Sequence, residues 1–251
     1  ILNTVAAGQS DGGDVTHVKK MLSLEKANTF DEITHFIKTL NTTVGQKVPL
    51  VVEPKLDGSA VSLKYANGKL YQVSTRGNGQ TGEDITARIP KTIKHLPRTI
   101  AYTGEIEIRG EIYLTNEDFE SANVNRMSYE YNEWTNRNTP KVTKTIEELL
   151  EIAYNDRLNN TTTVVESSTS KNSFAPVKYY FANSRNAVSG SMRQKTINYE
   201  VLMSLAVYDV DYEEMSLDYL QNLKFANDLG FKPAYVLIPK EIRELPVLEA
   251  V

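Results

Sequence analysis

Residues 53–75, EPKLDGSAVSLKYANGKLYQVST, decide the fold because they hold two alternating stretches on either side of a tight-turn signal. In the first stretch apolar and polar residues alternate with the period of a strand that buries one face. Asn67-Gly68 then predicts a type I′ turn, and a second strand follows it. The sequence therefore predicts an antiparallel hairpin, with Lys55 to Asp57 on or just after a strand and the following chain leading through a second strand into a third.

A further strand is predicted in GEIEIRGEIYL, residues 104–114, where charged and apolar residues alternate. Glu107, Arg109 and Glu111 fall on one face, and isoleucines fall on the other. For an isolated strand, such a charged row is typical of an ordinary solvated sheet face. The alternative is that these residues carry chemistry.

Helix signals are scattered between these strands. Thr29 and Glu32 have the spacing of a capping box at the start of an amphipathic segment. The predicted helices lie at residues 29–40, 116–125, 144–158 and 216–229, and a last strand is predicted at 201–210. Because no regular strand–helix–strand spacing appears, the predicted fold class is α+β with mostly antiparallel sheet. Residues 159–173, rich in Ser, Thr and Asn, predict an exposed, disordered connection.

Composition excludes several classes of protein. The 251 residues are 40% hydrophobic and 24% charged, which suits one large or two small globular domains. No stretch approaches the roughly 18 apolar residues of a membrane helix, so we expect a soluble, intracellular protein with no membrane partner. There is no cysteine, and the three histidines are far apart, so disulfides, thiolate chemistry and a zinc site are not expected. The net charge of −4 means that any nucleic-acid contact must be local.

Two motifs have a structural explanation as well as a functional one. Asp57-Gly58 is a common turn pair, and taken alone it predicts no more than a corner in the chain. GNGQTG, residues 77–82, matches the glycine pattern of dinucleotide-binding folds, but no parallel strand–helix–strand unit follows it. These glycines either let backbone amides approach a phosphate or DNA, or form a flexible loop.

Five blocks, taken in order, favour the functional explanation. The blocks are HVKKMLSLEKA (17–27), EPKLDG (53–58), STRGNGQTGEDIT (74–86), IRGEIY (108–113) and FANSRNAVSGSMRQ (181–194). Over roughly residues 17–232 the chain resembles the adenylation domain of bacterial-type NAD-dependent DNA ligases. The resemblance implies a nucleotidyltransferase fold, with mostly antiparallel sheets around a nucleotide cleft.

The resemblance also implies the reaction. Lys55 is expected to attack the α-phosphorus of NAD, release nicotinamide mononucleotide and hold AMP through a phosphoramidate bond. A free lysine has a pKa of about 10.4, so desolvation or nearby cations, with Arg76 and Arg109 as candidates, must favour the neutral amine. Asp57 is expected to orient Lys55 or to help bind Mg²⁺.

The same resemblance assigns the remaining site residues. Adenine contacts fall to Ser23, Leu24 and Glu53, AMP phosphate and ribose contacts to Arg76 and Glu111, and Mg²⁺ ligation to Asp57 and Glu111. Arg185 and Arg193 are expected to contact phosphates of nicked DNA or of the nucleotide, since arginine binds phosphate in a fork. For Leu24 the structural alternative is simple core packing.

The extent of the resemblance bears on activity. Residues 1–251 are expected to form a partial adenylation domain, because the family's next blocks do not follow. Residues 127–180 are expected to be an insertion, because this stretch is longer than the family's usual link. The chain would then be a cut fragment, or one part of a split viral or phage ligase whose second chain carries the missing segments. Its substrate would be nicked double-stranded DNA in the cytoplasm, or in the host cytoplasm for a virus. The alternatives are a non-catalytic docking subunit and an ATP-dependent nucleotidyltransferase.

Overall fold

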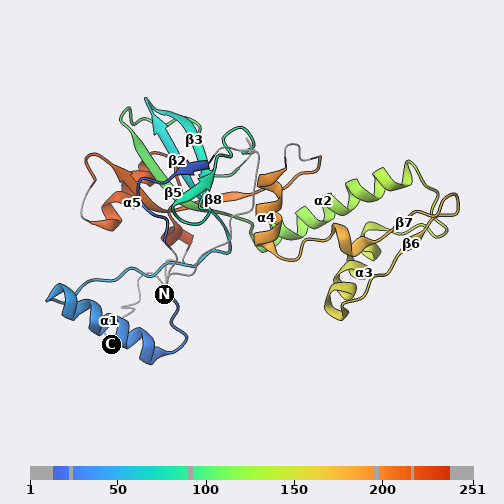
Figure 1. Cartoon of the computed structure of the whole chain (residues 1–251), viewed down its shortest axis with the longest axis horizontal. Helices are drawn as coiled ribbons and strands as arrows, with labels where there is room; N and C mark the ends of the chain where they lie inside the picture. The colour runs from blue at the N-terminus through green and yellow to red at the C-terminus, as the bar shows by residue number, and fades with distance from the viewer. Residues whose placement is uncertain (1–13, 23–24, 90–92, 195–197, 216–217, 238–251) are drawn as a thin grey trace.

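The hairpin around Asn67-Gly68 forms half of a four-stranded antiparallel sheet (Figure 1). The computed structural model describes residues 14–22, 25–89, 93–194, 198–215 and 218–237. In sheet order the strands are β3 (Lys69–Thr75), β2 (Gly58–Ala66), β5 (Ile106–Tyr113) and β8 (Ser204–Tyr212). Asn67 has φ 50° and Gly68 has φ 73°, the positive values that a type I′ turn requires. The predicted hairpin is therefore confirmed, as is a mixed helix and antiparallel-sheet fold.

The register of this sheet brings three distant segments together at one end. Gly58, the first residue of β2, pairs with Tyr113 of β5, and Ala60 pairs with Glu111. Val61 pairs with Thr75, the last residue of β3. Three segments therefore meet at the same end of the sheet: EPKLDG, the residues after Thr75, and the end of β5.

The described residues contain five α-helices. They are α1 (Phe30–Val44), α2 (Asn116–Thr135), α3 (Ile146–Asn159), α4 (Ser184–Arg193) and α5 (Tyr219–Asp228). The capping box predicted at α1 is confirmed, because the Thr29 side chain accepts from the Glu32 backbone N–H and the Glu32 side chain accepts in return. Shorter elements complete the fold: β1 (Asp14–Thr16) with β4 (Thr81–Glu83), β6 (Val165–Glu166) with β7 (Ser173–Phe174), and the 3-10 turns η1 (Pro176–Tyr179) and η2 (Ala234–Leu237).

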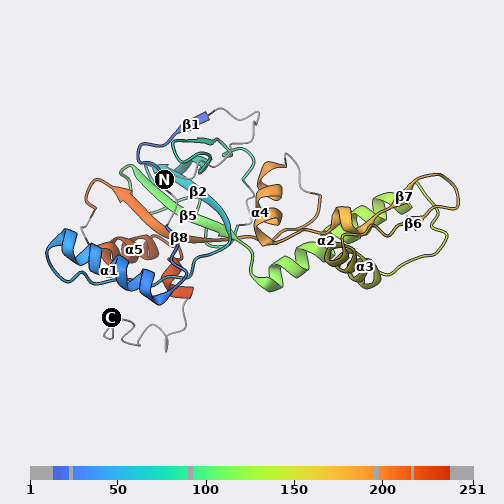
Figure 2. The ribbon, with the colours of Figure 1, turned by 60° about the horizontal axis from the view of Figure 1, so that its bottom comes forward.

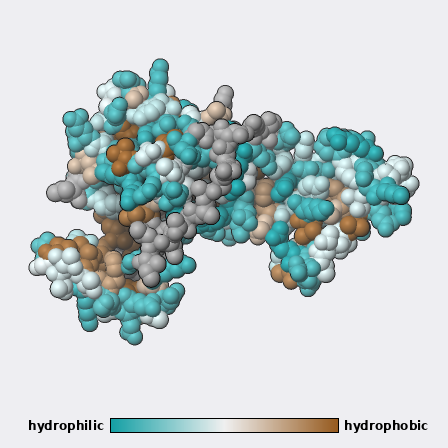
Figure 3. Space-filling model, viewed as in Figure 1, coloured by the Kyte–Doolittle hydropathy of each residue, from teal (hydrophilic) through white to brown (hydrophobic). Residues whose placement is uncertain are grey.

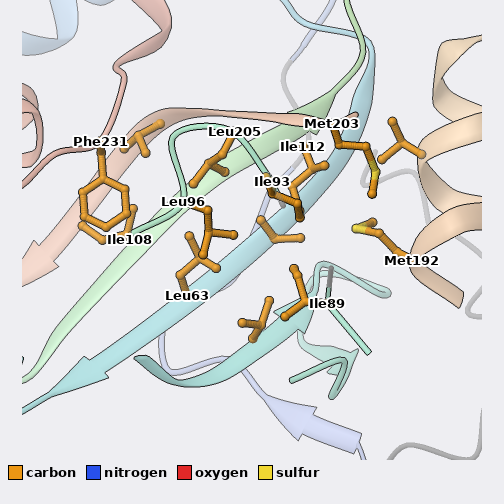
Figure 4. Packing of buried hydrophobic residues seen from close by; sticks show 14 of the residues in the cluster. Leu63, Ile89, Ile93, Leu96, Ile108, Ile112, Met192, Met203, Leu205 and Phe231 are labelled. Carbon is orange, nitrogen blue, oxygen red and sulfur yellow. The ribbon is translucent and has the colours of Figure 1, made fainter. Parts of the chain in front are cut away.

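The main core lies on the apolar face of the sheet. Figure 4 shows Leu63 of β2, Ile108 of β5 and Leu205 of β8 packed with Phe231, which follows α5. Met192 of α4 extends this core toward the end of the sheet where the EPKLDG segment enters. The core therefore fixes α4 against the strands that carry the candidate site.

The opposite face of β5 is charged but is not a solvated surface. Glu107 is 8% exposed and Arg109 6% exposed, because the chain around Lys19 crosses over them. The Arg109 guanidinium donates to Glu107 Oε1 at 2.8 Å and to the Lys19 carbonyl at 2.7 Å, and Ser62 Oγ donates to the same Glu107 oxygen. The interpretation of this row as an ordinary solvated face is wrong for Glu107 and Arg109.

Residues 127–180, here called the arm, project from the sheet in both ribbon views (Figures 1 and 2). The arm has an apolar cluster of its own, formed by Met127, Tyr131, Leu149, Ala153, Val165 and Phe174. Residues 159–173 are exposed as predicted, except for Val165 and Ser167, but the predicted disorder is wrong, because β6 and β7 pair there. Asp156 also orders the segment, since it accepts hydrogen bonds from Thr161 and Thr163.

The surface of the described chain is mixed in character (Figure 3). Apolar side chains gather on α1, where Phe30 and Phe36 are exposed. None of the helices in the described ranges is both long enough and apolar enough to cross a lipid bilayer.

Candidate functional site

The candidate site lies where β2 begins. Lys55 and Asp57 stand in the segment that enters β2, and both side chains are exposed to solvent. Gly58 follows at once, and its position is tightly constrained, because a Cβ there would lie 2.0 Å from the carbonyl oxygen of Ile112. This close approach pins the Lys-x-Asp-Gly segment to the end of β5. The segment is a strand entry rather than the hairpin corner that a turn pair alone would suggest.

Glu111 is the half-buried carboxylate of the site. Its Oε1 accepts the Gly58 backbone N–H at 3.2 Å. Burial raises the pKa of Glu111, and the positive charges of Arg185, Lys55 and Arg76 oppose that shift. The fold therefore brings these three cations, from three separate segments, into the electrostatic field of one carboxylate.

Arg185 comes to the site from α4. Its Nε donates to Asp57 Oδ1 at 2.7 Å, and the Ser184 hydroxyl lies 3.4 Å from the Asp57 carbonyl oxygen. The N-terminus of α4 is capped by Asn183, whose side chain accepts from the Asn186 backbone N–H. The first turn of α4 therefore faces the Lys-x-Asp-Gly segment.

Helix α2 positions the block that precedes α4. Asn123, 2% exposed, accepts the Phe181 backbone N–H at 2.8 Å through its side-chain oxygen, and its amide donates to the Phe119 carbonyl. The Arg126 guanidinium lies 4.4 Å from the centre of the Phe181 ring. These contacts fix the FAN block, and they were not evident from the sequence because Asn123 lies 58 residues before its partner.

Arg76 follows β3 and is held by the glycine loop behind it. Its backbone N–H donates to the Ala60 carbonyl, and Gly79 donates back to the Arg76 carbonyl. Gly77 and Gly79 both have positive φ, and a Cβ on Gly77 would lie 1.9 Å from the Thr81 carbonyl oxygen. GNGQTG is therefore a compact turn that ends β3 and directs the chain back into β4.

Glu53, the predicted adenine contact, lies half-buried against α5. The Tyr219 hydroxyl lies 2.8 Å from Glu53 Oε2 and 2.9 Å from the Tyr208 carbonyl oxygen. Burial raises the pKa of Glu53, against the opposing effects of the Tyr219 hydroxyl and the Tyr235 backbone. Sequence reasoning missed Tyr219, because its place in the helix predicted at 216–229 does not indicate which distant side chain it meets.

Tyr208 is a second tyrosine that sequence reasoning missed. Burial raises its pKa, and its phenol lies within the electrostatic reach of Glu111, Arg109 and Arg76. The only available signal was its place in the strand predicted at 201–210. An aromatic ring beside this carboxylate and these guanidinium groups offers a flat apolar surface inside a polar site.

The remaining predicted residues make no such contact with Asp57 or Glu111 in the part of the chain that the structure describes. Arg193 lies at the other end of α4, exposed, with its Nε donating to the Ser189 carbonyl, so the structure does not bring it beside Asp57 as it brings Arg185. Arg109 is bonded to Glu107 on the buried row. Ser23 and Leu24 lie outside the described residues.

The donor set suits a magnesium ion better than a metal held wholly by protein. Within the described ranges, no three His, Cys, Asp or Glu side chains are grouped so that they could hold a metal ion. Mg²⁺ usually takes one or two carboxylates together with water and substrate phosphates. Asp57 and Glu111, two carboxylates at the entry of β2, fit that pattern.

Comparison with known proteins identifies the family. The family described as NAD-dependent DNA ligase adenylation domain matches residues 10–142, just over half of the chain. A DNA ligase of Levilactobacillus brevis is 34% identical over 239 residues, covering 91% of this chain and 28% of its own length. A DNA ligase of Bacillus subtilis is 33% identical over 222 residues, covering 87% and 26%.

A DNA ligase of Metamycoplasma arthritidis is 48% identical over a shorter stretch of 111 residues, covering 44% of this chain and 16% of its own length. The chain thus spans about a quarter or less of the length of these relatives. The family match includes the entry of β2, the end of β3 and the whole of β5, which carry Lys55, Arg76 and Glu111. The chain belongs to the NAD-dependent DNA ligase adenylation domain family.

Proposed function

We propose that the end of the sheet where β2 begins is the nucleotide site of a nucleotidyltransferase, and that Lys55 is the residue that takes AMP. The observation that carries this proposal is the convergence of Lys55, Arg76 and Arg185 on Glu111 in a chain of this family. Lysine is a suitable nucleophile for a phosphoryl centre once it has lost its proton. The neighbouring guanidinium groups suit the phosphates of the donor.

The proposed first step forms one bond and breaks one. The neutral Lys55 amine attacks the α-phosphorus of NAD, a phosphorus–nitrogen bond forms, and the bond to the departing phosphate of nicotinamide mononucleotide breaks. The amine loses a proton, so the product is a lysyl-AMP phosphoramidate. In the later steps AMP passes to the 5′-phosphate of nicked DNA, and the 3′-hydroxyl then displaces it.

Each charged neighbour has a separate task in this proposal. Arg76 and Arg185 hold the phosphate oxygens, because a guanidinium can donate two parallel hydrogen bonds to them. Asp57 keeps Arg185 in place through the 2.7 Å ion pair. Arg193, at the far end of α4, is assigned to the DNA backbone, where an exposed arginine can bind a phosphate.

We further propose that Asp57 and Glu111 would hold Mg²⁺. When bound, that ion would neutralise charge on the phosphates during transfer. Because the chain spans only part of its relatives, the sealing reaction is proposed for the complete protein, with the remaining segments on the same polypeptide or on a second chain.

The test is sealing of a nicked DNA duplex by the complete protein, with NAD or ATP as donor. We expect NAD to support sealing by the wild type and by Lys47→Arg, which changes a nearby exposed lysine. Lys55→Arg should seal no nicks, because a guanidinium stays protonated. Sealing by Lys55→Arg would contradict the proposal. Sealing with ATP but not with NAD would point to an ATP-dependent enzyme. Nick sealing that is unaffected by Lys55→Arg would point to a docking subunit.

A further inference from the structure

His17 is a buried histidine that the proposed reaction does not use. It lies just after β1 and is 5% exposed. Its ring Nε2 lies 3.1 Å from the Thr75 carbonyl oxygen and 3.3 Å from the Arg76 carbonyl oxygen. Both oxygens can only accept hydrogen bonds, so Nε2 carries the ring hydrogen. Burial lowers the pKa of His17 from its ordinary value of 6.5, so the imidazole is neutral at pH 7.

The two carbonyl groups lie on either side of the Arg76 Cα. The Thr75 carbonyl belongs to the peptide plane before this atom, and the Arg76 carbonyl belongs to the plane after it. Because peptide planes are rigid, their orientations fix φ and ψ of Arg76, and with them the direction of its Cα–Cβ bond. One histidine ring therefore sets the direction in which the Arg76 side chain leaves the backbone.

The loop after β3 leaves room for this ring and holds it in place. A Cβ on Gly82 would lie 2.9 Å from His17 Nε2, so the glycine lets the ring approach the backbone. The His17 backbone N–H donates to the Gln80 carbonyl at 2.9 Å, and the Met21 N–H donates to the Gly79 carbonyl at 2.9 Å. His17 is therefore bonded to this loop through both its ring and its backbone.

The second ring nitrogen of His17 has no such bond. Nδ1 is buried and makes no hydrogen bond within the described part of the chain. A buried polar atom without a partner is costly, and such an atom in a native protein calls for a specific explanation. An apolar side chain would fill the same space without this cost. The two contacts at Nε2 supply an explanation, because they act on the residue that the proposed function assigns to phosphate.

We propose that His17 is a positioning residue, which directs the Arg76 guanidinium to the nucleotide phosphate by holding the carbonyl groups on both sides of the Arg76 Cα. This inference rests on the proposed function, since it concerns the same nucleotide site. Arg76 lies within the electrostatic reach of Glu111 and Tyr208, which places its charge in that site. His17 acts through Arg76 and does not touch the nucleotide.

The variants His17→Met and His17→Gln test this role as a matched pair. The two side chains have the same length, but only glutamine has a donor nitrogen at the place of Nε2. If His17→Met does not fold, His17→Asn replaces it, because its shorter amide reaches only the place of Nδ1. His35→Met, on the exposed side of α1, is the control for loss of a histidine ring.

Binding of AMP and of adenosine, which lacks the phosphate, is compared by calorimetry on the complete protein after bound AMP has been removed with nicotinamide mononucleotide. We expect His17→Met to weaken AMP binding by about 10-fold, the scale of a hydrogen bond to a charged group. Adenosine binding should change by less than about two-fold, and His17→Gln should recover most of the lost AMP affinity. Added to Arg76→Ala, His17→Met should cause no further loss. His35→Met should leave both affinities as in the wild type.

Four results would overturn the inference. An unchanged AMP affinity in His17→Met would show that the ring has no role. Equal losses for both ligands, or no recovery by His17→Gln, would show a merely structural role. A further loss in the Arg76→Ala protein would show that His17 does not act through Arg76. If Arg76→Ala alone weakened AMP binding in any of these cases, only the inference would fail; if it left AMP binding unchanged, the phosphate contact proposed for Arg76 would fail as well.

Discussion

Two opposing effects act on the pKa of the Glu111 carboxyl group. Burial disfavours its charge, and three neighbouring cations favour it, and the net result is a raised pKa. A carboxyl group that binds its proton more tightly in the folded state lowers stability when it is ionised. The penalty is absent below the unfolded value of 4.5, grows as pH rises toward the folded value and is complete above it. Glu111 therefore costs the fold stability at neutral pH, as expected of a site residue.

The first prediction concerns this cost. Glu111→Gln should raise the melting temperature at pH 7 and change it little at pH 4, because the amide resembles the protonated carboxyl and can still accept from Gly58. Glu107→Gln, on the same face of β5, should lower the melting temperature at pH 7, because it removes the closer of the two carboxylates that pair with buried Arg109 and leaves only Asp209, at 3.8 Å. Calorimetric scans at the two pH values make the measurement. A larger loss of stability for Glu111→Gln at pH 7 than at pH 4 would contradict the prediction that ionised Glu111 destabilises the fold.

At the scale of secondary structure, β2 and α4 define the site between them. The start of β2 is set by pairing with β5, and the first turn of α4 is set by the bond from Arg185 to Asp57. Both elements contain a glycine, but in very different surroundings. A Cβ on Gly58 would collide with the Ile112 carbonyl, whereas nothing lies within 4 Å of the Cβ position on Gly190 in α4.

The second prediction follows from that contrast. Gly58→Ala should destabilise the protein by at least about 1–3 kcal/mol, because strand pairing must shift to admit the methyl group. Gly190→Ala should stabilise it by about 0.5–1 kcal/mol, since glycine is a poor helix former. Urea unfolding of the two variants gives both values. Equal effects would mean that the close approach of β2 to β5 does not constrain the site.

Local patterns were sufficient to predict most of these elements. The Asn67-Gly68 hairpin, the capped start of α1 and the strand around Glu111 follow from period, turn chemistry and capping, which act over a few residues. The Tyr219 contact to Glu53 spans 166 residues, and no local signal indicates which side chain of a helix will meet a distant carboxylate. The burial of Glu107 and Arg109 depends in the same way on the chain segment around Lys19.

At the scale of the whole molecule, the described chain contains two large cores, besides a small cluster of Tyr113, Ala206 and Ala234. One lies on the apolar face of the four-stranded sheet, and the other lies in the arm. Helix α2 joins them, since Ala122 belongs to the first cluster and Met127 to the second. The sequence did not predict the arm core, because its members come from four short segments with no common period.

The third prediction is that the arm can be loosened alone. Leu149→Ala removes a fully buried side chain from the arm core and should cost about 2–5 kcal/mol there. Hydrogen exchange should become faster in α3, β6 and β7 and stay unchanged in β2 and β5. Leu158→Ala, on the exposed face of the same helix, is the control and should change neither region. Equal acceleration in β5 would show that the two cores unfold as one.

The central claim is that Lys55 takes AMP, and peptide mass mapping of the complete protein after incubation with NAD and Mg²⁺ tests it most directly. We predict an acid-labile adenylate on the peptide that contains Lys55, with none on the protein carrying Lys55→Ala. The Lys47→Ala protein should be modified like the wild type. Adenylate on a different residue, or efficient nick sealing by a protein whose Lys55 is never modified, would contradict the account.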